Sequence, residues 1–209
     1  MIRLAFLRHG ITAWNREGRI QGRTDIPLDP ESREQLAALT LPPDWRAATL
    51  HASPLSRAVE TATLIGKGRP VHTDPRLIEM DWGAWEGLHG RDLRADSASG
   101  YRDLEQWGWD FRPPNGESPA DVRERLRGWL KDLAPPPSQD QSPLPPGERE
   151  SYLIVTHIGV MRVALALAWG WDFRGPPPVP VKRNRLYALG LAADGTLRPA
   201  VPREGERLS

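Results

Sequence analysis

Two apolar runs end in histidine, and they predict the frame of the fold. Leu4-Ala5-Phe6-Leu7 leads into Arg8-His9-Gly10, and Tyr152-Leu153-Ile154-Val155 leads into Thr156-His157. Short apolar runs bounded by polar residues and glycine indicate buried strands. In open α/β sheets, ligands bind outside the carboxyl ends of the strands. If the two strands are neighbours, we expect both histidines to meet at one edge of the sheet.

Shorter signals between these runs predict alternating strands and helices. Further strands are expected at 47–52, 71–73 and 185–191. A polar cap followed by proline is typical of a helix start. Helices are expected from Pro30, from Pro54 with Ser53 as N-cap, from Pro119 with Ser118 as N-cap, and over 160–169. This alternation predicts an α/β fold, a three-layer α/β/α sandwich around a mostly parallel sheet.

The chain length of 209 residues allows one sizeable core with a small lid. We therefore expect a single domain over residues 1–209. An irregular stretch rich in tryptophan and glycine predicts a lid insertion at about 80–116, with one or two short helices. A change to Pro, Ser, Gln and Gly predicts a flexible loop at about 134–149.

Charge and composition narrow the class of partner. The chain has 28 Lys and Arg against 27 Asp and Glu, so no bulk basic field favours nucleic acid or a membrane surface. The absence of cysteine excludes disulfides, thiolate catalysis and cysteine zinc sites. No signal peptide is visible, and the most apolar later stretch is too short to span a bilayer. We expect a cytoplasmic protein, and a homodimer remains open.

The residues at the strand ends have the chemistry of an oxyanion site. Arg8 offers a bidentate donor, and His9 could act as acid, base or nucleophile. Arg57 falls near the start of a helix, where anions are favoured. With His157 these residues describe a phosphoryl pocket that works without a metal ion or other cofactor, in which guanidinium groups stabilise charge. The alternative is a strand end whose polar residues merely meet water.

Several motifs, in this order, resemble the histidine phosphatase superfamily, the phosphoglycerate mutase-like branch (branch 1). They run from Ile2 to about Ala168, and together they are specific although each is weak. The motifs are RHGIT at 8–12, Asn15, QGRTDIPL at 21–28, SPLSRAVETA from Ser53, Glu79 ahead of GAWEG, and VTHIGVMR from Val155.

The resemblance implies a phosphohistidine mechanism. His9 would attack phosphorus, and Glu79 would protonate the leaving alcohol and then activate water. Apolar neighbours of Glu79 would raise its pKa by desolvation. Other residues would contact the phosphoryl group or the rest of the substrate: Arg8, Arg57, His157 and Asn15 through side chains, and Gln21 and Gly22 through their backbone.

Two positions depart from the pattern of the family. Ile11 stands where an acidic residue or glutamine is usual, and Ile158 stands where glycine is common after the second histidine. A β-branched residue does not comfortably take a positive φ. Neither change removes a group that does chemistry.

The residues after Glu79 favour a phosphatase over a mutase. Glycolytic mutases of this family typically have Arg-His-Tyr-Gly there and an Arg-Arg pair in the lid for the substrate carboxylate. Here Met80-Asp81-Trp82-Gly83 follows Glu79, and Asp81 would repel a carboxylate. We therefore expect a phosphomonoesterase acting on a small phosphorylated metabolite. A phosphoglycerate mutase and an inactive phosphate-binding or interaction module on the same fold are the alternatives.

The lid tryptophans carry two interpretations. Trp82 could stack under a ring-bearing leaving group, as in aromatic phosphomonoesters or nucleotide-like esters such as ribazole phosphate. The simpler interpretation is that Trp82, Trp85, Trp107 and Trp109 pack the lid onto the core.

Overall fold

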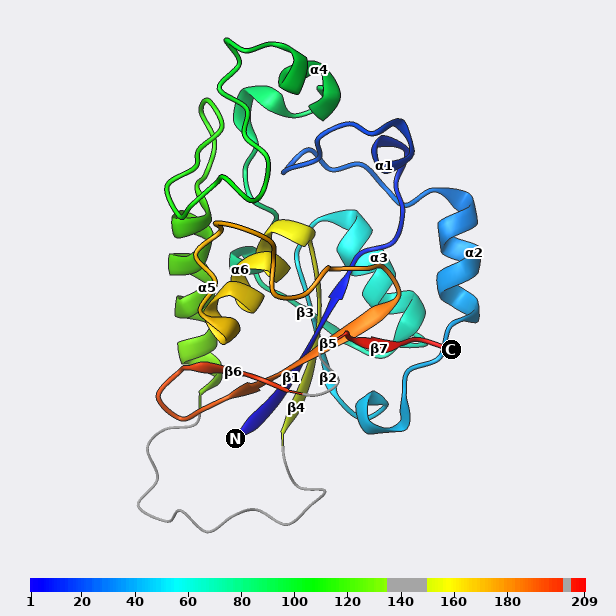
Figure 1. Ribbon diagram of the computed structural model, residues 1–209. Coiled ribbons are helices and arrows are strands. Elements are labelled where there is room, and N and C mark those ends of the chain that lie inside the picture. Colours follow the sequence, from blue (N-terminus) through cyan, green and yellow to red (C-terminus); the bar gives the residue numbers. More distant parts are fainter. Residues whose placement is uncertain (135–149, 201–203) are drawn as a thin grey trace.

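A computed structural model describes residues 1–134, 150–200 and 204–209 of the chain (Figure 1). The expected loop at 134–149 lies almost wholly outside these residues. The strands are β1 (Ile2–Arg8), β2 (Thr49–Ala52), β3 (Val71–Thr73), β4 (Ser151–Thr156), β5 (Arg185–Leu191), β6 (Leu197–Pro199) and β7 (Glu206–Arg207). The α-helices are α1 (Ala13–Glu17), α2 (Pro30–Ala38), α3 (Ser56–Ile65), α4 (Gly90–Ala95), α5 (Pro119–Leu133) and α6 (Ile158–Trp169). Short 3₁₀ turns occupy 43–45, 75–77 and 83–85.

One sheet joins the strands in the order β3-β2-β4-β1-β5-β6, and β7 pairs with β5. β3, β2, β4 and β1 are parallel to their neighbours, whereas β5 is antiparallel to β1, β6 and β7. Among the described strands, β5 alone runs against the rest, so the prediction of a mostly parallel sheet is confirmed. β1 and β4 are adjacent, with Arg8 opposite Thr156.

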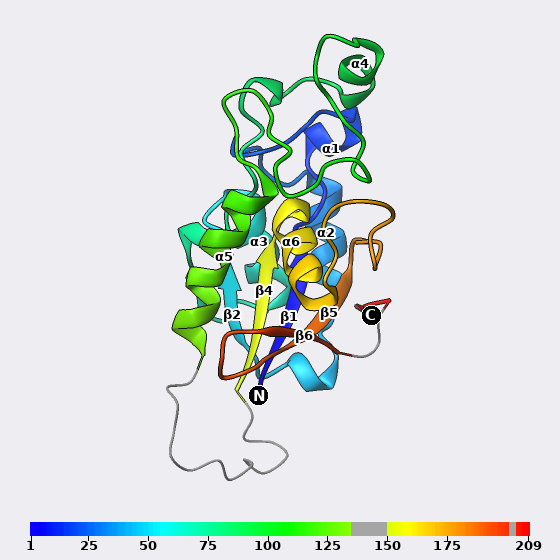
Figure 2. The ribbon, with the colours of Figure 1, turned by 60° about the vertical axis from the view of Figure 1, so that its left-hand side comes forward.

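The alternation of side chains along β1 explains the three layers. Leu4 and Phe6 belong to one buried cluster together with α5 and α6, while Ala5 and Leu7 belong to a second cluster with α2 and α3. Successive side chains of a strand point to opposite faces, so a strand that is apolar at every position must be covered twice. Figures 1 and 2 show α5 and α6 on one face and α2 and α3 on the other. This is the predicted α/β/α sandwich.

Two predicted helix starts are wrong by two residues. α3 begins at Ser56 rather than Pro54, and its N-cap position is Leu55, which makes no side-chain cap. The Asp25 carboxylate caps this helix instead, because it accepts hydrogen bonds from the Ser56 amide at 3.0 and 3.1 Å. Ser53 does not cap the helix, and its hydroxyl contacts His157 Nε2 instead. α6 begins at Ile158, two residues before the predicted start.

The lid rises above the carboxyl ends of the parallel strands and contains α4 and the 83–85 turn (Figure 1). Its aromatic side chains pack on one another and on the core: Trp107 stacks on Phe111 with ring centroids 4.6 Å apart, and its ring also faces Phe173 at 6.1 Å. Trp85 and Trp107 are buried in the same cluster as α5 and α6. Packing is therefore the main role that the structure shows for these two tryptophans.

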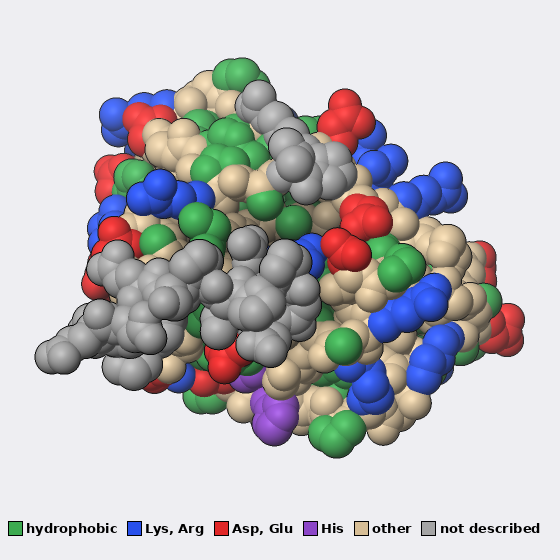
Figure 3. All heavy atoms as spheres, turned by 90° about the horizontal axis from the view of Figure 1, so that it is seen from below, with side chains coloured by type: hydrophobic (Ala, Val, Ile, Leu, Met, Phe, Trp, Pro, Cys, Tyr) green, Lys and Arg blue, Asp and Glu red, His purple; other side chains and the backbone are tan. Residues whose placement is uncertain are grey.

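The opposite end of the molecule has mixed charge. Acidic and basic side chains lie side by side on the face around the amino ends of the parallel strands, as far as the described residues form it (Figure 3). Within the described ranges, no helix is long and apolar enough to cross a membrane.

Candidate active site

The two histidines lie side by side because β1 and β4 are parallel neighbours. The His9 amide donates to the Thr156 carbonyl at 3.0 Å, which continues the ladder one residue beyond β1. The ring centroids of His9 and His157 are 5.1 Å apart. Both side chains are buried, with 3% and 0% of their surface exposed. The strand ends thus bring together the two imidazoles that were predicted to meet.

A backbone carbonyl determines which nitrogen of His9 carries the proton. His9 Nδ1 lies 2.7 Å from the Gly10 carbonyl oxygen. A carbonyl can only accept, so Nδ1 is protonated and donates, and Nε2 of the neutral ring keeps its lone pair. Burial lowers the pKa of His9 well below its usual range, and the nearby charges of His157, Arg57, Arg8 and Arg183 lower it further. His9 is therefore neutral near pH 7, as a nucleophile must be.

Ser53 orients the second histidine. His157 Nε2 lies 2.7 Å from Ser53 Oγ, and the same hydroxyl accepts a hydrogen bond from the Leu55 amide at 3.3 Å. A serine hydroxyl can donate to a ring nitrogen or accept from it, so this contact is compatible with a proton on either nitrogen of His157. His157 Nδ1 is buried and has no partner among the described residues. When Ser53 donates to Nε2, the His157 proton lies on Nδ1 and can be donated to an anionic oxygen.

Arg57 comes from the second position of α3 and is fully buried, at 0% exposure. Its guanidinium donates to the carbonyls of Gly22 at 2.6 Å and Thr24 at 2.9 Å. These bonds hold the loop that follows Gln21 against the site, and they occupy the Gly22 carbonyl. Arg57 Nε has no described partner. Arg57 therefore supplies positive charge and also fixes the loop, a second task that the sequence did not indicate.

Gly22 is required by a close approach to Glu86. A Cβ at position 22 would lie 1.9 Å from Glu86 Oε1, so any side chain there would displace the Glu86 carboxylate from its present position. Glu86 accepts hydrogen bonds from the amides of Arg23 and Thr24 at 2.7 and 2.8 Å. The glutamate of the GAWEG motif thus holds the same loop from the lid side. Gly22 does not line the pocket, so a direct contact with substrate stays a prediction.

Glu79 lies at the N-terminus of α6 and is almost fully buried, at 2% exposure. Its carboxylate accepts hydrogen bonds from the amides of Met80 at 2.9 Å and Gly159 at 3.0 Å. Burial raises its pKa, although these amides and the charges of Arg57 and Arg8 oppose that rise. A protonated carboxyl near neutral pH can act as a general acid. Desolvation, the expected cause, is confirmed.

Asn15 and Gln21 form a small polar network at the rim of the site. Gln21 Oε1 accepts from Thr12 Oγ1 at 3.0 Å and from Asn15 Nδ2 at 3.3 Å. Gln21 Nε2 is buried without a described partner. Both side chains line the pocket, so each has a donor hydrogen to offer a ligand. For Gln21 the structure thus presents the side chain, where the sequence suggested only the backbone.

Arg183 is a site residue that the sequence analysis missed. Its Nη1 donates to the carbonyls of His9 at 2.5 Å and Gly10 at 3.0 Å, and its Nη2 donates to Asn15 Oδ1 at 2.8 Å. Burial lowers the pKa of Arg183 to about 9, and the neighbouring charge of Arg8 contributes. Arg183 lies in a proline-rich connection before β5, where no local pattern distinguishes it from other surface arginines.

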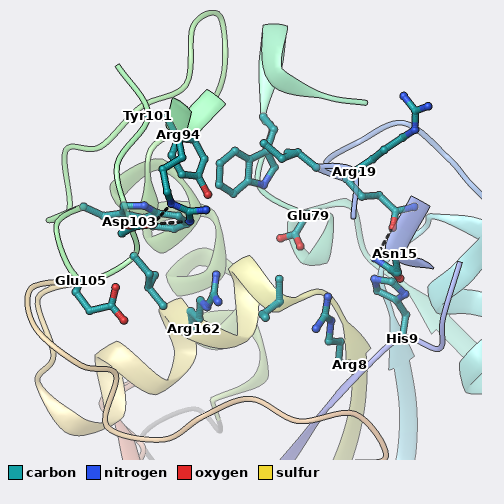
Figure 4. Close-up of a pocket in the computed structure, with 16 residues that line it drawn as sticks. Arg8, His9, Asn15, Arg19, Glu79, Arg94, Tyr101, Asp103, Glu105 and Arg162 are labelled. Atoms are coloured by element: carbon teal, nitrogen blue, oxygen red, sulfur yellow. Dashed lines mark hydrogen bonds and ion pairs between the residues drawn. The ribbon is translucent and has the colours of Figure 1, made fainter. Parts of the chain in front are cut away.

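The pocket is a cavity of about 420 Å³ between the sheet edge and the lid. Figure 4 shows His9 and Asn15 at one end, Glu79 near the middle, and Arg94, Tyr101, Asp103 and Glu105 at the lid end. Trp82 and Trp107 also line it, whereas Arg57 and His157 are not among its lining residues. Asp81 does not line it: its side chain accepts from the Gly83 amide and pairs with Arg23 at 3.5 Å. The structure therefore does not support the argument that Asp81 repels a carboxylate in the pocket.

The departure at position 158 causes no backbone strain. Ile158 is the first residue of α6 and is not among the residues with positive φ. Across the described residues, no group of three or more His, Cys, Asp or Glu side chains is placed to hold a metal ion.

The fold and the site together define the class of protein. The chain belongs to the histidine phosphatase superfamily (branch 1), whose family model matches residues 4–197. The chain is 36% identical over 160 residues to "Probable phosphoglycerate mutase GpmB" of Cronobacter sakazakii, covering 75% of this chain and 70% of that protein. It is 32% identical over 176 residues to the glucosyl-3-phosphoglycerate phosphatase of Mycolicibacterium vanbaalenii, covering 80% and 74%.

Solved structures agree with this assignment. A structure named "Mycobacterial hydrolase 1" superposes with a TM-score of 0.77 at 26% identity, covering 99% of each chain. A mycobacterial glucosyl-3-phosphoglycerate phosphatase in complex with VO3 superposes with a TM-score of 0.72 at 27% identity, covering 91% of this chain and 93% of that one. The relatives include phosphatases and a mutase, so family membership does not by itself select the reaction.

Proposed function

We propose that this chain is a metal-independent phosphomonoesterase that forms a phosphohistidine on His9. The observation that carries the proposal is the state of the His9 ring. Its Nδ1 proton is held by the Gly10 carbonyl, its Nε2 keeps a lone pair, and its pKa is lowered by burial and by the surrounding cations. A ring merely packed at a strand end has no need of a fixed tautomer beside several buried positive charges.

Three buried nitrogen atoms near His9 support a phosphoryl group as the ligand. Arg8 Nε, Arg57 Nε and His157 Nδ1 have no hydrogen-bond partner among the described residues. Unpaired buried donors cost free energy, and native structures retain them mainly where a ligand or water completes them. An anion with several oxygens can accept from all three. Guanidinium groups would then stabilise the charge that a magnesium ion stabilises elsewhere.

The residues divide the reaction into two balanced steps. His9 Nε2 attacks phosphorus, the bond from phosphorus to the leaving oxygen breaks, and Glu79 gives its proton to that oxygen. Glu79, now ionised, takes a proton from water, and the resulting hydroxide attacks phosphorus while the P–N bond breaks. Inorganic phosphate leaves, and both side chains return to their starting states. The raised pKa of Glu79 suits the first step.

The test is hydrolysis of 4-nitrophenyl phosphate with excess EDTA, together with acid quenching after brief reaction with a ³²P-labelled ester. We expect chelator-insensitive turnover and an acid-labile labelled protein. His9→Ala should lose both, and His72→Ala is the matched control because His72 is exposed on β3. Turnover that needs a metal ion, or labelling that persists in His9→Ala, would contradict the mechanism. Phosphate binding without turnover of any ester would instead support an inactive binding module.

A phosphoglycerate mutase is the second candidate, and the 36% identity to a relative of that name favours it. The Asp81 argument against it no longer holds. Interconversion of 2- and 3-phosphoglycerate primed by a bisphosphate, faster than phosphate release, would select the mutase. We favour hydrolysis because the described lid contains no adjacent pair of arginines of the kind that glycolytic mutases use for the substrate carboxylate.

A further inference from the structure

The floor of the pocket continues beyond the phosphoryl site to a second arginine. Arg162 lies on α6 one turn after Ile158, and its side chain rises into the cavity (Figure 4). Along the floor the view shows His9, then Arg8, then Arg162. Glu79 stands above and between His9 and Arg162. Arg162 is the last residue of the VTHIGVMR motif, and the resemblance to the family assigned it no role.

Beyond Arg8 at the phosphoryl site, Arg162 is the arginine of the pocket that lacks a hydrogen-bond or ion-pair partner among the described residues. It makes no hydrogen bond or ion pair with any residue in the described ranges, and its guanidinium lies 5.8 Å from the centre of the Trp107 ring. By contrast, Arg94 pairs with Asp103 at 2.6 Å, and Arg19 donates to the Gly87 carbonyl at 2.8 Å. Trp107 stacks on Phe111, which gives Arg162 a rigid surface to lie against.

The charges around Arg162 leave it cationic. Burial and, less strongly, the charge of Arg8 lower its pKa to about 10, although Glu79, Tyr101 and Glu105 oppose the decrease. At pH 7 the guanidinium is charged, and the nearest buried acid, Glu79, is one whose pKa burial raises. Glu105 faces the same cavity from the lid but forms no described ion pair with Arg162. A partly buried cation without a counter-ion favours binding of an anion.

The position of Arg162 indicates which part of the substrate it meets. In-line displacement places the leaving oxygen opposite His9 Nε2, within reach of Glu79. The rest of the leaving alcohol must then extend away from His9, over the floor where Arg162 stands. We propose that Arg162 binds a second anionic group, a carboxylate or a second phosphate, carried by the leaving alcohol. This inference rests on the proposed phosphatase function and specifies its substrate class.

The proposal replaces the expectation of an apolar, ring-bearing leaving group. Trp107 is only 4% exposed, and Trp82 makes edge contacts with Trp107 and Phe111 at 5.5 and 6.2 Å between ring centres. Among the residues lining the lid end of the cavity, Arg94, Tyr101, Asp103 and Glu105 are polar or charged, and Arg162 adds a positive charge from the floor. The lid therefore presents polar and charged side chains to the cavity as well as Trp82 and Trp107.

The experiment compares esters matched except for the second anion. The carboxylate arm uses 3-phosphoglycerate against glycerol 3-phosphate, and the phosphate arm uses 1,3-propanediol bisphosphate against 3-hydroxypropyl phosphate. 4-Nitrophenyl phosphate reports the basal reaction. We expect the wild type to prefer one anionic member by about ten- to a hundredfold in kcat/KM, as expected for a charge-assisted hydrogen bond. The arm with the preference identifies the anion.

Arg162→Met should remove that preference while changing turnover of 4-nitrophenyl phosphate by less than about threefold. Arg91→Met is the control, because Arg91 is an exposed arginine of α4 that does not line the pocket. Equal losses on anionic and neutral esters in Arg162→Met, or no preference in the wild type, would overturn the inference and leave the phosphatase proposal intact.

A binding measurement keeps the inference independent of turnover. Calorimetric titration of His9→Ala with the matched esters should show tighter binding of the preferred anionic member. The double variant His9→Ala/Arg162→Met should lose the difference. If the difference persists in the double variant, another residue binds the second anion and the assignment is wrong.

Discussion

Arg183 offers the sharpest test of how the nucleophile is positioned. Its guanidinium bridges the carbonyls of His9 and Gly10 and the side chain of Asn15, and the Gly10 carbonyl is the same oxygen that holds His9 Nδ1. Arg183→Met preserves part of the apolar stem but removes the donors and the charge. The His9 carbonyl then loses its only described partner, while the Gly10 carbonyl keeps His9 Nδ1 and Asn15 Oδ1 keeps the Thr12 amide.

The structure sets the expected size of the effect. A hydrogen bond to a charged group is worth about 1.5–3 kcal/mol, but only part of that acts on the orientation of the His9 ring. A loss of about 1–2 kcal/mol in the transition state corresponds to roughly a 5- to 30-fold lower kcat. The free energy of unfolding should fall by less than the loss of three hydrogen bonds implies. The variant also removes a buried positive charge that is unfavourable in the folded protein, as the lowered pKa of Arg183 indicates.

The pH profile separates this positioning role from a purely structural one. Beyond burial, the charge of Arg183 helps to lower the pKa of His9, so its removal raises that pKa. His9 must be neutral to attack, and activity falls as the pH drops through its pKa. The acid limb of kcat/KM should therefore move to higher pH in Arg183→Met. Arg183→Lys keeps the positive charge but lacks the planar guanidinium with its several donors. Its acid limb of kcat/KM should therefore lie at the wild-type pH, while kcat recovers only in part.

The assay is steady-state hydrolysis of 4-nitrophenyl phosphate across pH, with thermal unfolding measured in parallel. Arg185→Met is the control, since Arg185 lies two residues further on and donates instead to the Gly205 carbonyl at 2.9 Å. If Arg183→Met had the kcat and the acid limb of the wild type, the contacts of Arg183 would not position His9. A loss confined to KM would point to substrate binding instead.

Three further variants test the other supports of the site. Ser53→Ala removes the hydrogen bond to His157 Nε2 and so frees the ring to change tautomer. If the transition state loses roughly 1–2 kcal/mol of stabilisation, steady-state kinetics should show kcat lowered about 5- to 30-fold with little change in KM. Gly159→Ala places a Cβ 2.4 Å from Glu79 Oε1 and should displace the carboxylate. We expect kcat to fall at least about tenfold, which corresponds to a rise of about 1.4 kcal/mol in the activation free energy. The control Gly128→Ala meets its nearest atom only at 3.9 Å, and equal activities of the two alanine variants would contradict the clash. Glu79→Gln should be more stable than the wild type, by an amount that grows with pH. Burial raises the pKa of Glu79 in the folded protein above its unfolded value of about 4.3. The wild type therefore loses stability as the pH rises from the unfolded pKa through the folded pKa, whereas the glutamine variant does not. Melting curves from pH 4 to 8 should diverge from wild type, and parallel curves would show that the carboxylate is not destabilising.

Local patterns were sufficient for much of the site. The apolar runs that end at His9 and His157 predicted their strands, because a strand buried on both faces must be apolar at nearly every position. Ser118 caps α5 as expected, with its side chain accepting from the Asp121 amide at 3.3 Å. The motif order pointed to the family, and the family model confirms it.

Other parts depend on contacts between residues far apart in the chain. The start of α3 is determined by Asp25, 31 residues before the helix, so the serine and proline beside the helix gave the wrong boundary. Arg183 reaches Gly10 across 173 residues, and no nearby residue marks it out.

The amino-acid sequence by itself determined where the two central strands end and to which family the chain belongs, since these follow from short apolar runs and motifs. The same motifs predicted His9 as the nucleophile and Glu79 as the acid. Only the tertiary structure decided which donors are already occupied and which remain free. Arg57 and Arg183 are held by backbone carbonyls, whereas Arg162 faces the cavity with no hydrogen-bond or ion-pair partner among the described residues. A guanidinium has the same chemistry wherever it stands in the chain, and only its surroundings in the folded protein decide what it can bind.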